Sequence, residues 1–341
     1  MRLARRSALV ILAVALPLCG QAFAEGVVNV YSYRQPPLVQ PLFDAFTAKT
    51  GIAVKMVFAE KGLIERLEQE GPLSPADVLL SSDVGKLVEA TGKGLAQPVS
   101  SDLISSKIPV NLRATDNQWF GLTMRARVVY ASVKRVPQTS ISYEELADPK
   151  WKGKICTRPF DHPYNLGLTA FMLAKKGDAA TKLWLEGVKA NFAVKPNGND
   201  RSQAKSVMAG ECDLALGNTY YMGLMQTNTT EPEQQEWARA SRILFPSSPD
   251  TGTHVNISGM LMTKTAPDKD NALKLMEFLA SDEAQALYAS GNFEYPVNPA
   301  VKPSDTVAAW GPLIPDSINV ADVAKHLKRA AELVAEVDMN D

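Results

Sequence analysis

Two adjacent tyrosines, Tyr220 and Tyr221, are the side chains with the clearest potential for chemistry in this sequence. They follow a short apolar run at residues 214–216 and precede a segment, residues 222–225, that can be helical. Neighbouring side chains of a strand point to opposite faces, whereas on the first turn of a helix they lie about 100° apart and can converge. Converging phenolic oxygens could clamp a hard, highly charged metal ion. The alternative is that one ring packs in a core and the other is solvated at a helix start.

The residues just before the pair are suited to begin such a helix. Asn218 and Thr219 both carry a side-chain oxygen that can accept a hydrogen bond from the first turn, so either can be the N-cap. The Asn218 amide could instead donate to a bound anion, and the sequence leaves both roles open.

The N-terminus has the three parts of a secretory signal, and we predict that residues 1–24 are removed by cleavage after Ala24. The parts are a basic start (Arg2, Arg5 and Arg6), an apolar core at residues 8–19, and a small-x-small site at Ala22-Phe23-Ala24. No other run approaches the length that a membrane helix needs. We therefore expect an exported protein without membrane insertion.

Charge and length narrow the class of protein further. Removing the signal takes away three of the 36 basic residues and none of the 37 acidic ones, so the exported chain is slightly acidic. Such a chain lacks the basic surface of a nucleic-acid-binding protein. The roughly 300 residues that remain exceed what one compact core usually serves, so we expect two lobes.

Two cysteines, Cys156 and Cys212, remain after the signal. In an oxidising compartment an even number of cysteines favours a disulfide, and we predict this pairing. The alternative is a pair of free buried thiols. A metal–thiolate site is disfavoured, because no other cysteine or histidine lies close to either in sequence.

The first hundred exported residues alternate between strand and helix patterns, which indicates an α/β lobe with a mixed, mainly parallel sheet. Ligands of such sheets bind beyond the carboxyl ends of the strands, here residues 31–35 and 81–83. The predicted strands are 27–31, 52–58 and 76–80, and the predicted helices are 38–49, 62–70 and one that Asp83 opens. Pro36 and Pro37 are expected to break the loop after the first strand.

A second lobe is expected to begin near Arg125, after strands at 119–123 and 128–131 that leave the first lobe. A strong apolar strand at 257–263 is expected to cross back. We predict that residues 25–124 with about 250–300 form lobe 1, and 125–249 with about 301–341 form lobe 2. Further expected elements are strands at 154–158 and 213–216 and helices at 165–175, 179–191, 200–209, 272–279 and 282–289.

Several stretches together resemble the periplasmic ferric-iron-binding proteins of ABC importers, which have the two-lobed type II periplasmic binding fold with crossover strands. They are Val30-Tyr31-Ser32-Tyr33-Arg34-Gln35, Ser74-Pro75-Ala76-Asp77-Val78, Gly121-Leu122-Thr123-Met124-Arg125-Ala126-Arg127, Gly153-Lys154-Ile155-Cys156, Gly217-Asn218-Thr219-Tyr220-Tyr221 and Asn256-Ile257-Ser258-Gly259. Each stretch is weak alone, but their joint order is specific, and the resemblance runs over essentially all of residues 25–341.

The resemblance implies that Fe(III) is bound in the cleft by Tyr220, Tyr221 and Tyr164. Some family members also place a histidine and a tyrosine directly after the arginine that matches Arg34, but here those places hold Gln35 and a proline. Others use a first-lobe glutamate, and residues 81–83 contain none. The chain therefore looks closer to the branch that completes the coordination with a synergistic anion, usually carbonate.

In that branch Arg34 and Gln35 would hold the anion, with Asn218 and Arg125 as further candidates. A guanidinium suits this role because its planar fork of donors matches an oxyanion. Arg127, near the lobe crossing like Arg125, could instead pair with a carboxylate. Fe(III) prefers anionic oxygen, and a bound cation drives the proton off a phenol whose pKa in water is near 10.

These expectations describe capture and delivery to an ABC permease in the inner membrane by a periplasmic, monomeric binding protein, rather than an enzyme. We find no HExxH motif, nucleophile elbow or telling pair of carboxylates. The alternatives are a binding protein for a small organic solute, such as a polyamine, thiamine or a phosphonate, and an exported iron–tyrosinate enzyme. His162 is expected in an exposed loop, Arg158 at the surface or between the lobes, and Tyr33 in the core.

Overall fold

The computed structural model describes residues 26–341, so the predicted signal at residues 1–24 lies outside the described part. The strands are β1 (Val27–Ser32), β2 (Ala53–Phe58), β3 (Val78–Ser81), β4 (Phe120–Ser132), β5 (Ile155–Cys156), β6 (Leu214–Asn218), β7 (Ser241–Leu244), β8 (Val255–Met262) and β9 (Tyr295–Pro296). The helices are α1 (Pro36–Thr50), α2 (Leu63–Glu70), α3 (Val84–Gly92), α4 (Asp102–Lys107), α5 (Pro163–Lys176), α6 (Asp178–Ala190), α7 (Asp200–Ala209), α8 (Thr219–Gln226), α9 (Glu233–Arg239), α10 (Lys269–Ala280), α11 (Asp282–Asn292), α12 (Asp305–Ala308), α13 (Val320–Ala324) and α14 (Leu327–Glu336).

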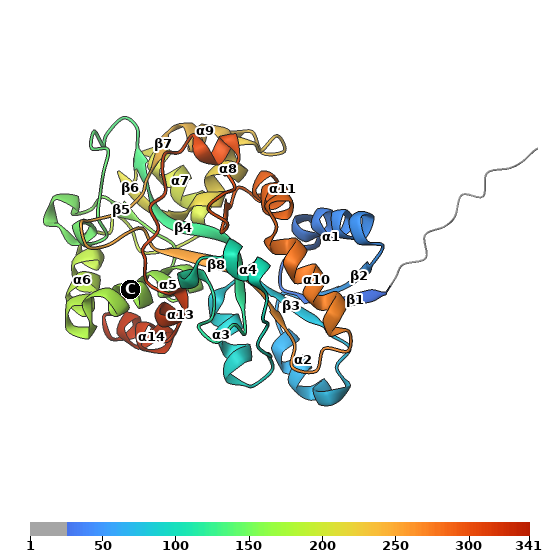
Figure 1. The fold of residues 1–341 in the computed structure, drawn as a ribbon. Coiled ribbons are helices and arrows are strands. Elements are labelled where there is room, and N and C mark those ends of the chain that lie inside the picture. Colours follow the sequence, from blue (N-terminus) through green and yellow to red (C-terminus); the bar gives the residue numbers. More distant parts are fainter. Residues whose placement is uncertain (1–25) are drawn as a thin grey trace, which may run out of the picture.

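The strands form one sheet in the order β2-β1-β3-β8-β4-β6-β5, and β7 and β9 also pair with β4. Figure 1 shows two parts: β1–β3 with α1–α3, α10 and α11 on one side, and β5–β7 with α5–α9 on the other. The expectation of two lobes, each with a mixed sheet and flanking helices, agrees with this arrangement. The exact lobe limits given above remain our proposal.

The expected dominance of parallel pairing is wrong in detail. Between the named strands of residues 26–341, parallel pairing is confined to β1 with β2, β1 with β3, and β5 with β6, while the other strand pairs are antiparallel. The physical reason is that β4 and β8, which cross between the two parts, run against their neighbours.

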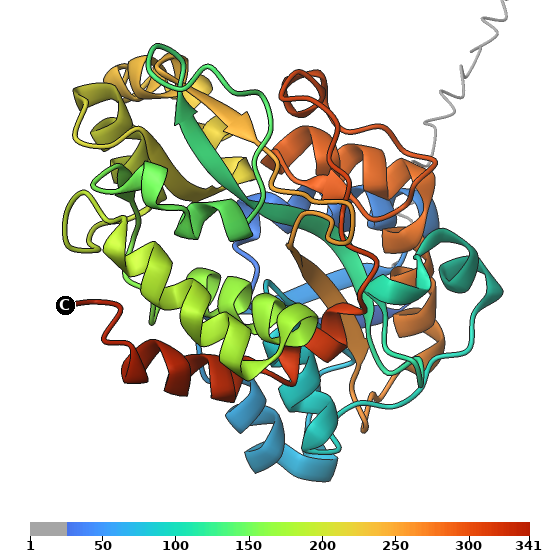
Figure 2. The same ribbon diagram turned by 90° about the vertical axis from the view of Figure 1, so that its left-hand side faces the viewer.

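Strand β4 joins the two parts without interruption. We expected two strands at 119–123 and 128–131, but the structure has one strand of 13 residues, all of them buried. Its first half pairs with β8 and β9, and its second half pairs with β6 and β7. Figure 2 shows this teal-to-green strand passing from one part into the other. Antiparallel β8 is the second crossover, as expected from residues 257–263.

The side chains of β6 alternate between two cores. Leu214 and Leu216 face a cluster built with α5, α6 and α14, whereas Ala215 faces the larger cluster that also contains the apolar residues of β1, β3 and β8. This alternation follows from the two-residue period of a strand. The alternation fixes the orientation of β6, and α8, which carries the tyrosine pair, begins directly after this strand.

Local sequence signals explain several helix ends. Pro36 and Pro37 do not break a loop but begin α1, because a proline at the first helical position lacks only an N–H that would be unpaired anyway. Gly51 ends α1 in the left-handed region, at φ 74°. Helix α7 has the predicted bounds, set by a capping box between Asn199 and Ser202 and by Gly210.

The predicted disulfide between Cys156 and Cys212 is present, with 5.8 Å between the two Cα atoms. It ties the end of β5 to the residues just before β6, and these two strands lie side by side. No helix in the described part of the chain is long and apolar enough to cross a membrane.

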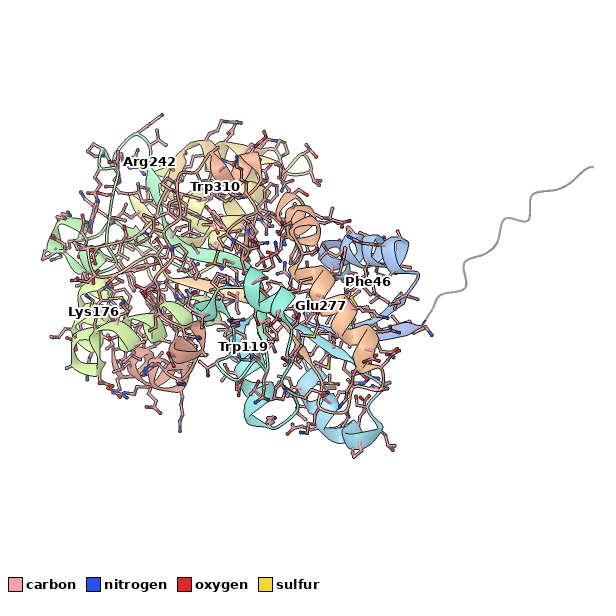
Figure 3. The ribbon with its side chains drawn as sticks, viewed as in Figure 1. Phe46, Trp119, Lys176, Arg242, Glu277 and Trp310 are labelled. Carbon is pink, nitrogen blue, oxygen red and sulfur yellow. A yellow bond between two sulfur atoms is a disulfide. The ribbon has the colours of Figure 1, made fainter. Side chains whose placement is uncertain are left out.

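The C-terminal segment returns across both parts. Trp310 donates to the Gln226 side chain at the end of α8 over 3.1 Å, and Figure 3 shows it beside that region. Helix α13 contacts both α3 and α5, and α14 packs on α5. We did not predict α12–α14, β7 or α9. All but α14 have seven residues or fewer and carry little periodicity, whereas α14 has ten residues and buries Ala330, Leu333 and Val334 along one face.

Candidate metal centre

Three phenols meet at the start of two helices. Tyr164 is the second residue of α5, and Tyr220 and Tyr221 lie in the first turn of α8. The hydroxyl oxygens of Tyr164 and Tyr220 are 2.9 Å apart, and the ring centroids of Tyr220 and Tyr221 are 4.4 Å apart with an interplanar angle of 34°. Helix α8 begins where β6 ends, so both rings of the pair point to one region.

The N-caps of the two helices differ. Asn218 has the extended backbone of an N-cap, but its side chain makes no capping hydrogen bond and instead accepts from Nη1 of Arg127 over 3.2 Å. At α5, Nδ1 of His162 accepts the backbone N–H of Tyr164 over 3.3 Å. His162 is half-buried and its ring centroid lies 4.4 Å from that of Tyr164, so the expectation of an exposed loop histidine is wrong.

Burial governs the ionisation of the tyrosine pair. It raises the pKa of Tyr220 well above the ordinary value near 10, and the neighbouring phenols of Tyr164 and Tyr221 add to the effect. Burial and the Tyr164 phenol likewise raise the pKa of Tyr221. Without a metal ion these two side chains are therefore neutral, and a cation at this place must displace their protons.

Three arginines lie against the phenol rings. The guanidinium carbons of Arg127 and Arg158 are 5.9 and 4.9 Å from the centre of the Tyr164 ring, and that of Arg201 is 5.1 Å from the centre of the Tyr221 ring. Their positive charge favours the phenolate form of the site.

A buried carboxylate, Asp200, anchors two of these arginines. Its Oδ2 lies 2.7 Å from Nη1 of Arg127, and its Oδ1 lies 3.2 Å from Nη1 of Arg158. The possibility that Arg127 pairs with a carboxylate is thus realised. Arg158, expected at the surface or between lobes, has a side chain only 11 % exposed because it packs against Asp200.

Arg34, the first candidate for the anion, is already paired. Its two Nη groups donate to the two carboxylate oxygens of Glu294 over 3.2 and 3.4 Å, and both residues are buried. The hydroxyl of Thr123 also donates to Glu294. Nε of Arg34 is buried and has no hydrogen-bond partner. Gln35 is exposed at the N-cap of α1.

A small polar cavity adjoins the phenols and contains two of the anion candidates, Arg125 and Asn218. Its lining comes from both crossover strands, from α5 and from the end of β6, and consists of Arg125, Arg127, Tyr164, Asn218, His254 and Asn256. Arg125 is held from the β3–α3 loop, where the Ser82 carbonyl accepts from it and Asp83 lies 3.8 Å away. Arg34 and Gln35 do not line this cavity.

Asp83 and Tyr33 have the structural roles that we expected of them. Asp83 caps α3 by accepting the Gly85 N–H over 2.7 Å, as a helix-start aspartate should, and it also accepts from Asn256 over 2.7 Å. Tyr33 is buried, as expected. Asp200, Arg201, His254 and Asn256 were not predicted as site residues, although Asn256 begins one of the stretches that resemble the family.

Comparison with known proteins identifies the class. Residues 41–313 match the family described as bacterial extracellular solute-binding protein, and the chain belongs to that family. Iron uptake protein A1 of Synechocystis sp. is 40% identical over 311 residues, covering 91% of this chain and 86% of that protein. The major ferric iron-binding protein of Neisseria meningitidis serogroup B is 32% identical over 298 residues, covering 85% of this chain and 86% of that protein.

Solved structures agree with the fold. The Bordetella ferric binding protein superposes with a TM-score of 0.89 at 45% identity, covering 92% of this chain and 100% of that one. A Trichodesmium protein in complex with iron and citrate ligands gives 0.87 at 40% identity, covering 92% and 99%. These neighbours confirm the predicted type II periplasmic binding fold and the resemblance to ferric-iron-binding proteins.

Proposed function

We propose that this protein captures Fe(III) between its lobes with the phenolates of Tyr164, Tyr220 and Tyr221 and delivers it to an ABC permease. The observation that carries the proposal is the 2.9 Å approach of the Tyr164 and Tyr220 hydroxyls beside the Tyr221 ring. A trivalent hard cation prefers anionic oxygen ligands, and three phenolates neutralise it. The names of the relatives above, which are iron uptake and ferric iron-binding proteins, support the same cargo.

The charge around the phenols supports a divalent synergistic anion, for which carbonate is the candidate. Arg127, Arg158 and Arg201 lie against the phenol rings, and Asp200 is ion-paired with the first two of them. Three positive charges and one negative charge leave two positive charges around the phenols. Iron with three phenolates adds no net charge, so a dianion would balance the site. The iron and citrate ligands named for the Trichodesmium structure are a precedent for an organic anion in a relative.

The anion would enter the small polar cavity, where Arg125 and Asn218 offer donors. Arg34 can contribute only if it shares its guanidinium between the anion and Glu294, and its unpartnered Nε is the available donor. Gln35 is exposed at the N-cap of α1 and would reach the anion as the lobes close.

Capture therefore has two steps in this proposal. The second lobe carries all three phenols, so it holds the ion first, and closure then adds the donors of the first lobe and excludes water. We propose that the mature chain acts in the periplasm as a monomer and binds without turnover. The family of extracellular solute-binding proteins supports the location and the partnership with a permease.

A visible absorption spectrum with metal analysis tests the proposal. Protein loaded with Fe(III) and bicarbonate should bind one iron and show the charge-transfer band of a ferric phenolate. The double variant Tyr220→Phe/Tyr221→Phe should lose both. Tyr295→Phe is a matched control, because the Tyr295 hydroxyl is buried without a hydrogen-bond partner and its residue lies on β9, opposite Met124 of β4.

Retention of full colour and affinity by the double variant would overturn the tyrosinate site. Wild-type protein that carries an organic solute and takes up no iron would favour the alternative of a small organic ligand. Turnover that disappears in the double variant would favour the enzyme.

A further inference from the structure

We propose that the buried pair of Asp200 and Arg127 is a positioning device that holds the start of α5 against the start of α8, so that the three phenols meet. The inference rests on the proposed function and assigns residues that touch no metal themselves. Tyr164 and the tyrosine pair are 56 residues apart in sequence, so tertiary contacts must set the distance between them.

Asp200 holds the residue that precedes α8. It is the first residue of α7 and is fully buried. Its Oδ2 accepts the backbone N–H of Asn218 over 2.8 Å, in addition to Nη1 of Arg127. Asn218 is the last residue of β6 and directly precedes the turn of helix with Tyr220, so Asp200 fixes the point at which this turn begins.

Arg127 forms hydrogen bonds next to the starts of both α5 and α8. Its Nε and Nη2 donate to Oδ1 of Asn165 over 3.1 and 2.7 Å, and its Nη1 donates to Oδ1 of Asn218 over 3.2 Å. Asn165 follows Tyr164 on α5, and Asn218 precedes α8. A single planar guanidinium therefore bridges the two elements that carry the phenols, which a lysine ammonium cannot do with the same geometry.

Further hydrogen bonds and strand pairing hold Arg127 and Asn165 in place. Arg127 lies on β4 directly opposite Asn218 on β6, and the backbone N–H of the adjacent Ala126 donates to the Thr219 hydroxyl over 3.2 Å. Asn165 is held in turn, because its amide donates to the Thr157 hydroxyl and the Arg158 carbonyl over 3.0 Å each. Residues that orient metal ligands without touching the metal typically contribute 10–100-fold to metal affinity.

Four substitutions, one of them a control, test the inference in the whole mature protein. Asp200→Asn removes the charge that holds Arg127, and Arg127→Lys keeps the charge but loses the fork. Asp213→Asn is the matched control: Asp213 also pairs with an arginine, Nε of Arg135 at 2.6 Å, but it lies at the other end of β6. Asp200→Glu restores the carboxylate.

The measurements are Fe(III) affinity by chelator competition in bicarbonate buffer, the position of the visible band, and the melting temperature without metal. We expect Asp200→Asn and Arg127→Lys to bind one iron with about 10–100-fold lower affinity and a shifted band. Asp213→Asn should keep the wild-type band and affinity, and Asp200→Glu should recover part of both. A purely structural role would lower the melting temperature but leave the band in place.

The inference is overturned if folded Arg127→Lys keeps the wild-type band and an affinity within twofold, even should Asp200→Asn fail to fold. Failure of the proposed function looks different, because wild-type protein itself would then show no iron-dependent visible band.

Discussion

Arg34 and Glu294 form a buried fork in the first lobe, with both guanidinium Nη groups on both carboxylate oxygens. The arginine is 8% exposed and the glutamate 3% exposed. A synergistic anion that binds Arg34 must therefore compete with the Glu294 carboxylate. Anion binding at Arg34 thus depends on whether Glu294 stays paired with it.

Glu294→Gln should lower the stability of the protein without bicarbonate and increase the stabilisation that bicarbonate provides. Removing one partner of a buried ion pair leaves an uncompensated charge and typically costs about 3–5 kcal/mol. Bicarbonate should restore part of this loss, which melting temperatures measured with and without bicarbonate will detect.

Thr123→Val is the control for this change, because it removes the other polar contact of Glu294 without altering charge. If bicarbonate stabilises Glu294→Gln no more than wild type, Arg34 is only a structural residue of the first lobe.

Tyr164→Phe should weaken iron binding more than any substitution that leaves the three phenols intact. It removes one anionic oxygen and the 2.9 Å contact to Tyr220, while the ring can still pack against His162 and Arg158. We expect a loss beyond the roughly 100-fold that marks the upper range for residues outside the coordination sphere. Chelator competition at fixed bicarbonate measures it, and an unchanged affinity would remove Tyr164 from the ligand set.

His254 should make the metal-free protein less stable in acid. Burial is the main cause that lowers its pKa from 6.5 to about 3, with Arg127 and Arg125 adding to the effect and Asp316 opposing it. Below the unfolded pKa, the unfolded chain binds a proton that the folded chain refuses. The free energy of unfolding therefore falls as the pH drops from about 6.5 toward 3, by up to about 1.4 kcal/mol per pH unit.

Denaturant unfolding of His254→Gln across this range checks the prediction. The variant should show a shallower acid slope than wild type, and His326→Gln, at the N-cap of α14, serves as the control. Equal slopes in wild type and His254→Gln would contradict it.

The double variant Cys156→Ala/Cys212→Ala should lose about 4 kcal/mol of stability on the chain-entropy estimate for a loop of this length. Denaturant unfolding measures the loss. A reductant should destabilise wild type by a similar amount and leave the variant unaffected, whereas a reductant effect on both would point to another target.

Much of the fold was predictable because its signals are local. Gly51 and Gly210, which end α1 and α7, and Asp83, which begins α3, act within a few residues of where they stand. Pro36 and Pro37 are local signals too, but they start α1 and do not break a loop. The tyrosine pair belongs to this class, since an apolar strand followed by Asn218 predicts a helix start.

The rest depended on contacts between distant residues. Arg127, Asn165, Asp200 and Asn218 come from four separate elements, and no local pattern predicts that one guanidinium joins them. The partner of Arg34 is 260 residues away in sequence. The continuity of β4 was missed because Arg125 and Arg127 interrupt its apolar pattern, although both arginines are buried in the structure.

The bridging position of α13 gives this molecule a natural place for an optical reporter. Since α13 rests on α3 and on α5 together, any change in the angle between the lobes has to tilt or slide it against one of them. Lys325 follows this helix with an exposed side chain, well apart in sequence from the phenols and arginines of the site. A dye carried there would register opening and closing in real time while leaving every ligand of the ion untouched.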